Sequence, residues 1–200
     1  MRTHNPFATD FRWSLAAIFV GVLTLFGCSV NVKKEPNGED KQVDIHTPVG
    51  GIHVSKQADV ADTGLTVYPG ARLREKGSDG DDKSANVNIS GPGFGVKVVA
   101  LEYESDDPPD KVIAFYTDQL KKFGSVLVCH TRDHGGFDME YPTDDSKKSK
   151  ELTCDKETGN NVELKVGTRD NQHIVRVEPA GKGSNFALVY VRTHGKDTSI

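Results

Sequence analysis

The chain has 200 residues, of which 36% are hydrophobic and 27% charged, and this composition allows one ordinary packed domain with a modest core. Its formal net charge is −4 at pH 7. This mildly acidic balance argues against a nucleic-acid partner, which would need a clustered excess of Lys and Arg. It also gives no reason to expect electrostatic attachment to anionic lipid.

The amino terminus has the pattern of an export signal. Arg2 and Arg12 precede an uncharged apolar run from Leu15 to Phe26. This run is typical of a secretory signal and too short for a membrane-spanning helix, which needs ~20 apolar residues. It ends at Leu25-Phe26-Gly27-Cys28 and resembles the signal peptides of bacterial lipoproteins, in which Leu and small residues precede the lipidated Cys. Phe26 departs from that pattern, because a small residue is usual there.

The resemblance implies a signal peptide over 1–27 and acyl chains on Cys28. The mature protein would then lie in the cell envelope, lipid-anchored to a membrane and facing the periplasm or the exterior. Two or three acyl chains on one Cys anchor a protein well, at ~0.8 kcal/mol per buried CH₂. Two other interpretations of residues 1–28 stay open: an uncleaved membrane anchor, and a buried apolar helix that ends in an ordinary Cys.

Residues 28–63 read as a polar tether that contains one short β-hairpin. Residues 29–42 are polar, with Pro36-Asn37-Gly38 as turn material, and are expected to form a flexible stalk. Over residues 43–54, apolar and polar positions alternate on both sides of a Pro- and Gly-containing turn, which predicts a hairpin. Such a hairpin is marginal alone and should dock on something or be mobile. His46 and His53 could face each other across it.

Residues 64–194 carry the signals of the main domain, with a flexible tail at 195–200. One helix is expected over about 108–123, because Pro108 and Pro109 suit a first turn, Asp107 is placed to cap it and Gly124 to end it. Apolar side chains recur within it at helical spacing. The strand candidates are 65–68, 86–90, 94–104, 125–131, 151–154, 161–166, 173–178 and 185–192. This order predicts an α+β fold, with a mostly antiparallel sheet and one main helix packed on one face.

Two short motifs in this domain, Tyr68-Pro69-Gly70-Ala71 and Phe115-Tyr116 followed by Leu120, resemble small exported domains of uncharacterised bacterial lipoproteins. The resemblance covers roughly residues 65–190. It implies a fold and a location, and carries no established activity.

Besides Cys28, the chain contains two cysteines, Cys129 and Cys154. An even pair in an oxidising compartment usually forms a disulfide, and both lie in strand candidates that could be neighbours. Two alternatives stay open: a reactive thiol served by His130 or His134, and two buried free thiols.

Other motifs give weak signals for chemistry. Gly91-Pro92-Gly93-Phe94-Gly95 lacks the Lys and Ser or Thr of a phosphate loop, and Asp79-Gly80-Asp81-Asp82 lacks the spacing of a calcium loop. The run from Cys129 to His134 has too few ligands for structural zinc. We therefore expect no catalytic residue, no metal site and no cofactor.

The sequence favours a non-catalytic binding or envelope-structural module, with a possible protein partner in the envelope. One alternative is a small-ligand-binding protein whose pocket lies between helix and sheet and is lined by Tyr116. A second alternative is an enzyme whose dispersed site unites a carboxylate with His130, His134 or His173.

Overall fold

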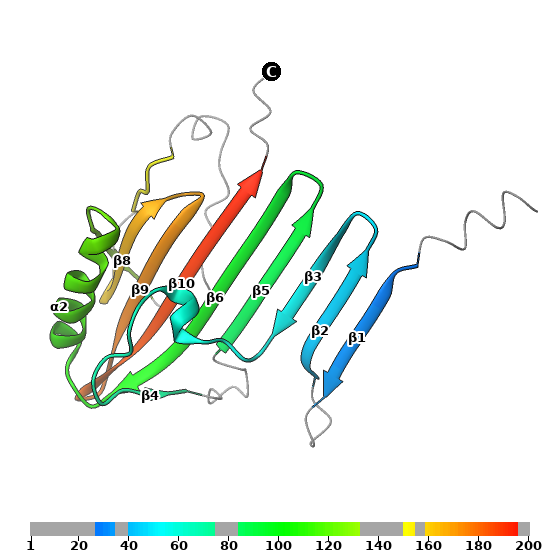
Figure 1. Cartoon of the computed structure of the whole chain (residues 1–200). Helices are drawn as coiled ribbons and strands as arrows, with labels where there is room; N and C mark the ends of the chain where they lie inside the picture. Colours follow the sequence, from blue (N-terminus) through cyan, green and yellow to red (C-terminus); the bar gives the residue numbers. More distant parts are fainter. Residues whose placement is uncertain (1–26, 35–39, 75–83, 133–149, 155–158, 196–200) are drawn as a thin grey trace, which may run out of the picture.

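A computed structural model of the chain describes residues 27–34, 40–74, 84–132, 150–154 and 159–195, and the statements below concern these residues. They form one ten-stranded sheet, with one α-helix and two short 3₁₀ helices (Figure 1). The strands are β1 (Ser29–Lys34), β2 (Asp40–Thr47), β3 (Gly50–Ser55), β4 (Arg72–Leu73), β5 (Ser84–Gly91), β6 (Phe94–Ser105), β7 (Leu127–Thr131), β8 (Asn161–Thr168), β9 (Asn171–Ala180) and β10 (Gly183–Gly195). The helices are η2 (Val60–Thr63), α2 (Pro109–Leu120) and η3 (Lys121–Phe123).

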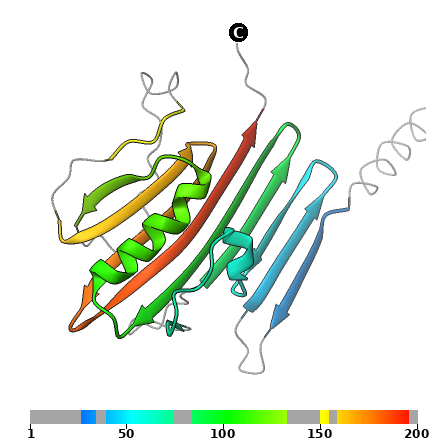
Figure 2. The same cartoon turned by 60° about the vertical axis from the view of Figure 1, so that its left-hand side comes forward.

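The sheet runs in the order β1-β2-β3-β5-β6-β10-β9-β8-β7, and β4 pairs with the end of β6. All of its strand pairs are antiparallel. The last strand in the chain, β10, lies in the middle of the sheet between β6 and β9, and α2 packs over β8, β9 and β10 (Figure 2). The predicted α+β fold with one packed helix is confirmed.

The helix lies where the sequence places it. The α-helical part ends at Leu120, the 3₁₀ turn continues to Phe123, and Gly124, with φ +141°, ends the element. One detail differs: Pro108 is the N-cap residue, and Asp107 does not cap the helix. The Asp107 carboxylate instead accepts hydrogen bonds from the Tyr68 hydroxyl (2.9 Å) and from Lys111 Nζ (2.6 Å).

The core lies between α2 and the second half of the sheet. On the helix, Val112, Tyr116 and Leu120 are fully buried, one helical turn apart. They pack on the sheet residues Val99, Leu101, Tyr103, Leu164, Val166, Val175, Val177, Phe186 and Leu188. Each large apolar side chain buried there contributes ~1.5–3 kcal/mol relative to exposure.

The segment Leu65–Tyr68, a predicted strand, is not a strand in the structure. Its backbone bonds to helix side chains in place of a neighbouring strand. Tyr68 N–H donates to the Tyr116 hydroxyl (3.0 Å), which in turn donates to the carbonyl of Thr66 (3.2 Å). Thr66 N–H donates to Gln119 Oε1 (3.1 Å). Buried backbone groups need partners, and here a Tyr and a Gln supply them.

The amino-terminal part departs most from expectation. Residues 29–34 are not a stalk, because they form β1 and pair in register with β2. The hairpin expected over 43–54 is present as β2 and β3, and β3 pairs with β5. The hairpin therefore docks on the main domain. A single sheet joins the predicted tether, residues 28–63, to the predicted main domain, residues 64–194. Residues 60–63 form η2, whose Thr63 is fully buried.

Two further differences concern strands. Residues 151–154 form no strand, whereas β10 continues to Gly195, beyond the expected end at residue 192. Residues 1–26 of the export signal predicted over 1–27, the acidic loop at 79–82, and residues 196–200 of the tail predicted over 195–200 lie outside the described residues.

Candidate functional site

The apolar side of the sheet changes from one face to the other across its width. In β8, β9, β10 and the second half of β6, the side chains of the core cluster lie on the face that carries α2, which we call the helix face. Ile174 and Val189 are also buried, but they lie on the opposite face of β9 and β10. In β1, β2, β3, β5 and the first half of β6, the helix face is polar. There the Val and Ile side chains lie on the opposite face, because successive side chains of a strand point to opposite sides.

The register aligns these Val and Ile residues into two rows that cross the sheet. The first row is Val30, Ile45, Ile52, Ile89 and Val96, each directly opposite the next on the neighbouring strand. The second row is Val32, Val43, Val54, Val87, Val98 and Val191. We call these eleven residues the aliphatic face. All of them are β-branched, and neither row contains a charged residue.

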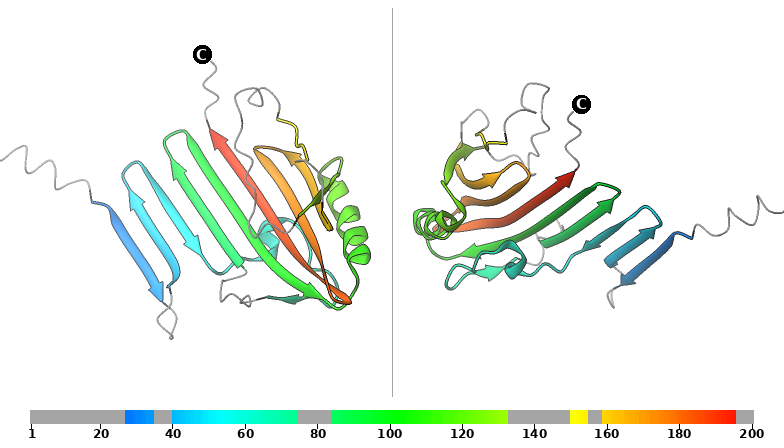
Figure 3. Two further views of the ribbon diagram at one scale, coloured as in Figure 1. Left: turned by 180° about the vertical axis from the view of Figure 1, so that it is seen from behind. Right: turned by 45° about the horizontal axis from the view of Figure 1, so that its top comes forward.

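Four of the eleven residues of the aliphatic face are exposed, and the other seven are half-buried. The exposed fraction is 64% for Val30, 40% for Val32, 39% for Ile52 and 37% for Val54, and Phe94 beside it is 49% exposed. The contacts of β1, β2 and β3 with other described elements are those with their sheet neighbours, whereas α2 packs on β8, β9 and β10. Seen from behind, no described helix crosses β1, β2, β3 or β5 (Figure 3). Exposed apolar patches larger than a few hundred Å² mark interaction sites in soluble domains.

The reverse side of the same strands is hydrophilic. Asp44 accepts hydrogen bonds from Gln42 Nε2 (2.6 Å) and pairs with Nδ1 of His53 (2.5 Å). The hydrogen bond with His53 is the largest cause that holds the pKa of the Asp44 carboxyl below its ordinary value. Further along, Lys97 Nζ pairs with the Asp62 carboxylate (2.8 Å). This side of β2, β3 and β6 is therefore the polar one, and the aliphatic face is the apolar one.

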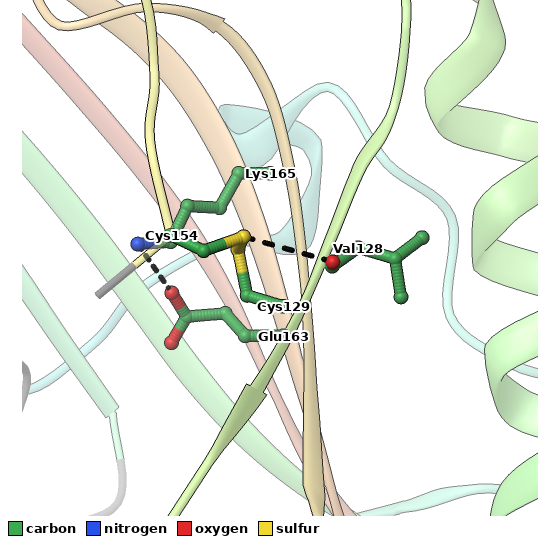
Figure 4. The surroundings of a disulfide bond; sticks show 5 residues. All are labelled: Val128, Cys129, Cys154, Glu163 and Lys165. Carbon is green, nitrogen blue, oxygen red and sulfur yellow. Dashed lines mark hydrogen bonds and ion pairs between the residues drawn. A yellow bond between two sulfur atoms is a disulfide. The ribbon is translucent and has the colours of Figure 1, made fainter. Parts of the chain in front are cut away.

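The two edges of the sheet differ. At one edge, β7 is joined to residues 150–154 by a disulfide between Cys129 and Cys154, whose Cα atoms are 5.4 Å apart (Figure 4). Sγ of Cys154 lies 3.6 Å from the carbonyl oxygen of Val128, and Lys165 pairs with Glu163 (2.8 Å) beside the bridge. The predicted disulfide is confirmed. The other edge is β1, where the register shifts between Lys33 and Lys34.

Cys28 is exposed and stands directly before the edge strand β1. Its thiol takes part in no disulfide, because the bridge joins the other two cysteines. The predicted lipidation residue is therefore accessible, and no spacer separates it from the folded sheet.

The histidines singled out from the sequence are not brought together. His46 lies opposite Gly51, and His53 opposite Asp44, so the two do not face each other as expected. His130 is exposed on β7, and His134 lies outside the described residues. Among the residues that the structure places, no group of three His, Cys, Asp or Glu side chains could hold a metal ion.

His173 is a core residue. Its Nδ1 lies 2.9 Å from the carbonyl oxygen of Thr63, and its ring stacks on Phe123 with centroids 3.8 Å apart and contacts Tyr190. Burial lowers the pKa of His173, which keeps the ring neutral. None of these contacts of His173 is with a carboxylate, so its surroundings are those of a buried structural histidine.

Tyr116, the expected wall of a ligand pocket, is fully buried, and its hydroxyl is bonded to the backbone of residues 66 and 68. The helix residue Tyr116 and the sheet residues beneath it belong to one buried apolar core. A hollow among the described residues, lined by Arg74, Glu102 and Arg176 on the face away from α2, has a volume of only about 40 Å³. Small-molecule pockets usually enclose ~300–1,000 Å³.

Sequence reasoning missed the aliphatic face. Its signal was present as pairs of β-branched residues two positions apart in five segments, of which Val30 with Val32 and Val87 with Ile89 are examples. Each pair reads alone as an ordinary half-buried strand. Only the register shows that all the pairs lie on one face, and that this face is not the one under α2.

Within the described ranges, no helix is both long and apolar enough to cross a lipid bilayer. Comparison of the chain with family models, with curated proteins and with solved structures finds no significant match.

Proposed function

We propose that this chain is an exported, lipid-anchored protein of the cell envelope that acts as a non-catalytic binding module. The observation that carries the proposal is the aliphatic face, because its four exposed and seven half-buried β-branched side chains are costly to leave in contact with water. A surface of this kind lowers its free energy when a partner covers it.

Three features support the anchor and the compartment. Leu25, Gly27 and Cys28 match the end of a lipoprotein signal. Cys28 is exposed and unbridged, as a residue that receives acyl chains must be. The disulfide between Cys129 and Cys154 fits an oxidising compartment outside the cytosol. With the lipid on Cys28, the edge strand β1 and the aliphatic face would begin at the membrane surface.

The anchor is tested by expressing the full chain in a bacterium and separating the membrane and soluble fractions. The wild-type chain should be recovered with the membranes, and mass spectrometry of its amino-terminal peptide should show acyl chains on Cys28. Cys28→Ser should carry no acyl chains and leave the membrane fraction. Ser29→Ala is the matched control and should behave as wild type. An unmodified Cys28 in the wild-type chain would refute the anchor.

The binding role is tested by amine-reactive crosslinking in intact cells. The wild-type chain should give products of higher mass. Ile52→Asp places a carboxylate on the aliphatic face and should remove them, whereas Asn88→Asp adds the same group to the helix face of the neighbouring strand and should keep them. Products that form equally in both variants would show that binding uses another surface.

A further inference from the structure

Two turns of the sheet lie at the same end as Cys28. Cys28 precedes β1, and Ser29 of β1 pairs with His46 near the end of β2, so the β2–β3 turn lies beside Cys28. The β5–β6 turn comes next along this end (Figure 1). The two turns are in contact, because a side-chain carbon on Gly50 would lie only 3.0 Å from the Cα atom of Gly91. We call the start of β1 and these two turns, residues 28–30, 47–50 and 91–94, the uncharged end.

The uncharged end differs in charge from the rest of the sheet. Segments 28–32, 45–52 and 84–96 contain no Asp, Glu, Lys or Arg. The opposite ends of these strands carry charged residues, namely Lys33, Lys34, Asp40, Glu102 and Glu104. The β8–β9 turn, at the same end of the sheet but several strands away, carries Arg169 and Asp170. Among the described residues at this end, the uncharged stretch therefore lies around Cys28.

The uncharged end also exposes large apolar side chains. The exposed fraction is 67% for Val49 in the β2–β3 turn, 49% for Phe94 at the β5–β6 turn and 64% for Val30 on β1. Pro48 and Pro92 are exposed in the same two turns. Turns that face water usually carry polar residues. Uncharged tips with exposed apolar side chains instead suit the boundary between headgroups and acyl chains of a bilayer, which apolar surfaces enter by ~5–10 Å.

The short connection from Cys28 to the sheet sets the position of this end. Val30 is two residues from Cys28, so its Cα atom lies within ~7 Å of the anchored residue. The β5–β6 turn lies three to four strands from β1, which is ~14–19 Å at ~4.8 Å per strand. A lipid on Cys28 therefore brings the uncharged end to the membrane surface.

We propose that the uncharged end lies in the headgroup boundary of the membrane that holds the lipid on Cys28, with Val49 and Phe94 inserted among the lipids. This rests on the anchor proposed above and adds a second membrane contact to it. The contact is apolar, so it needs no anionic lipid and is compatible with the net charge of −4. Contacts spread along one end of the sheet hold its strands upright, and the aliphatic face then points sideways, along the membrane.

The test uses a tryptophan at position 94 as a probe of lipid contact. The chain contains a single Trp, Trp13, which lies in the predicted signal peptide, so the processed Phe94→Trp chain has only the new one. The acylated protein is purified from membranes and reconstituted into phosphatidylcholine vesicles with brominated acyl chains, which quench a Trp that contacts them. Phe94→Trp should be quenched several-fold more than Leu73→Trp, the matched control, because Leu73 is similarly exposed (44%) but lies at the opposite end of β6.

A second variant tests the neighbouring turn. Val49→Asp in the Phe94→Trp chain should lower the quenching roughly twofold or more, because a carboxylate is costly to place among lipids. Folding of each variant is checked by the absence of alkylatable thiol at Cys129 and Cys154.

Mass spectrometry of the same samples shows whether Cys28 carries acyl chains. Equal quenching of Phe94→Trp and Leu73→Trp in an acylated chain would overturn the membrane contact and leave the anchor standing. Quenching that Val49→Asp does not change would overturn the insertion of the two turns in the same way. A chain without acyl groups on Cys28 would refute the anchor, and the contact with it.

Discussion

Removal of the disulfide between Cys129 and Cys154 should cost the protein a large part of its stability. The bridge spans 25 residues in sequence, and closing a loop of that length stabilises the folded state by about 3.5 kcal/mol when the entropy of the unfolded chain is the source. The variant is Cys129→Ala with Cys154→Ala, which removes both partners of the bridge so that neither is left as an unpaired thiol. Its midpoint of thermal unfolding should fall by roughly 7–14 °C for a domain of this size.

The assay is urea unfolding followed by circular dichroism, for the wild-type chain and the double variant, each with and without a reductant. The reductant should lower the free energy of unfolding of the wild-type chain nearly to that of the variant, and should leave the variant unchanged. Cys129 is only 1% exposed, so the lost sulfur adds a small packing term that the reduced wild-type chain does not share. If the free energies of unfolding of the oxidised wild-type chain and the double variant differ by less than about 1 kcal/mol, the loop-entropy reasoning is refuted.

Two further predictions concern the core. Tyr116→Phe removes the hydroxyl that bonds Tyr68 N–H and the carbonyl of Thr66, and leaving these groups unpaired should lower the free energy of unfolding by ~1–3 kcal/mol in urea titration; a change within measurement error would contradict this role. For His173, burial lowers the folded-state pKa below the unfolded value of ~6.5, so the unfolded chain binds more protons as the pH falls through that window. The free energy of unfolding should therefore decrease from pH 7 to pH 5, and decrease less in His173→Gln; equal slopes would exclude His173 as the source.

Local signals were enough to predict the helix and most of the strands. The helix needed only its own residues, since two prolines mark its start, Gly124 marks its end, and apolar side chains recur at helical spacing. Segment 65–68 shows the limit of local signals. Its backbone is paired by Tyr116 and Gln119 of the helix, and no pattern within four residues can reveal a partner about fifty positions away.

The candidate site could not be predicted because it depends on pairing between distant segments. Residues 29–34 are mostly polar and belong to the stalk predicted over 29–42, although Val30 and Val32 alternate with polar neighbours in the period of a strand. The face that these valines share with Val54 and Val87 is set by the register of β1, β2, β3 and β5. A shift of one residue in any of these strands would send its aliphatic side chains to the other side.

The position of β10 has a consequence for the order in which this protein is assembled. The strand closest to the carboxyl terminus holds the centre of the sheet, bonding β6 on one side and β9 on the other. The amino-terminal strands up to β6 can pair with one another, but β6 has no neighbour on its far side until residues 183–195 have been synthesised. The central pairing of the sheet is therefore a late, long-range step of folding, because it joins segments far apart in the chain.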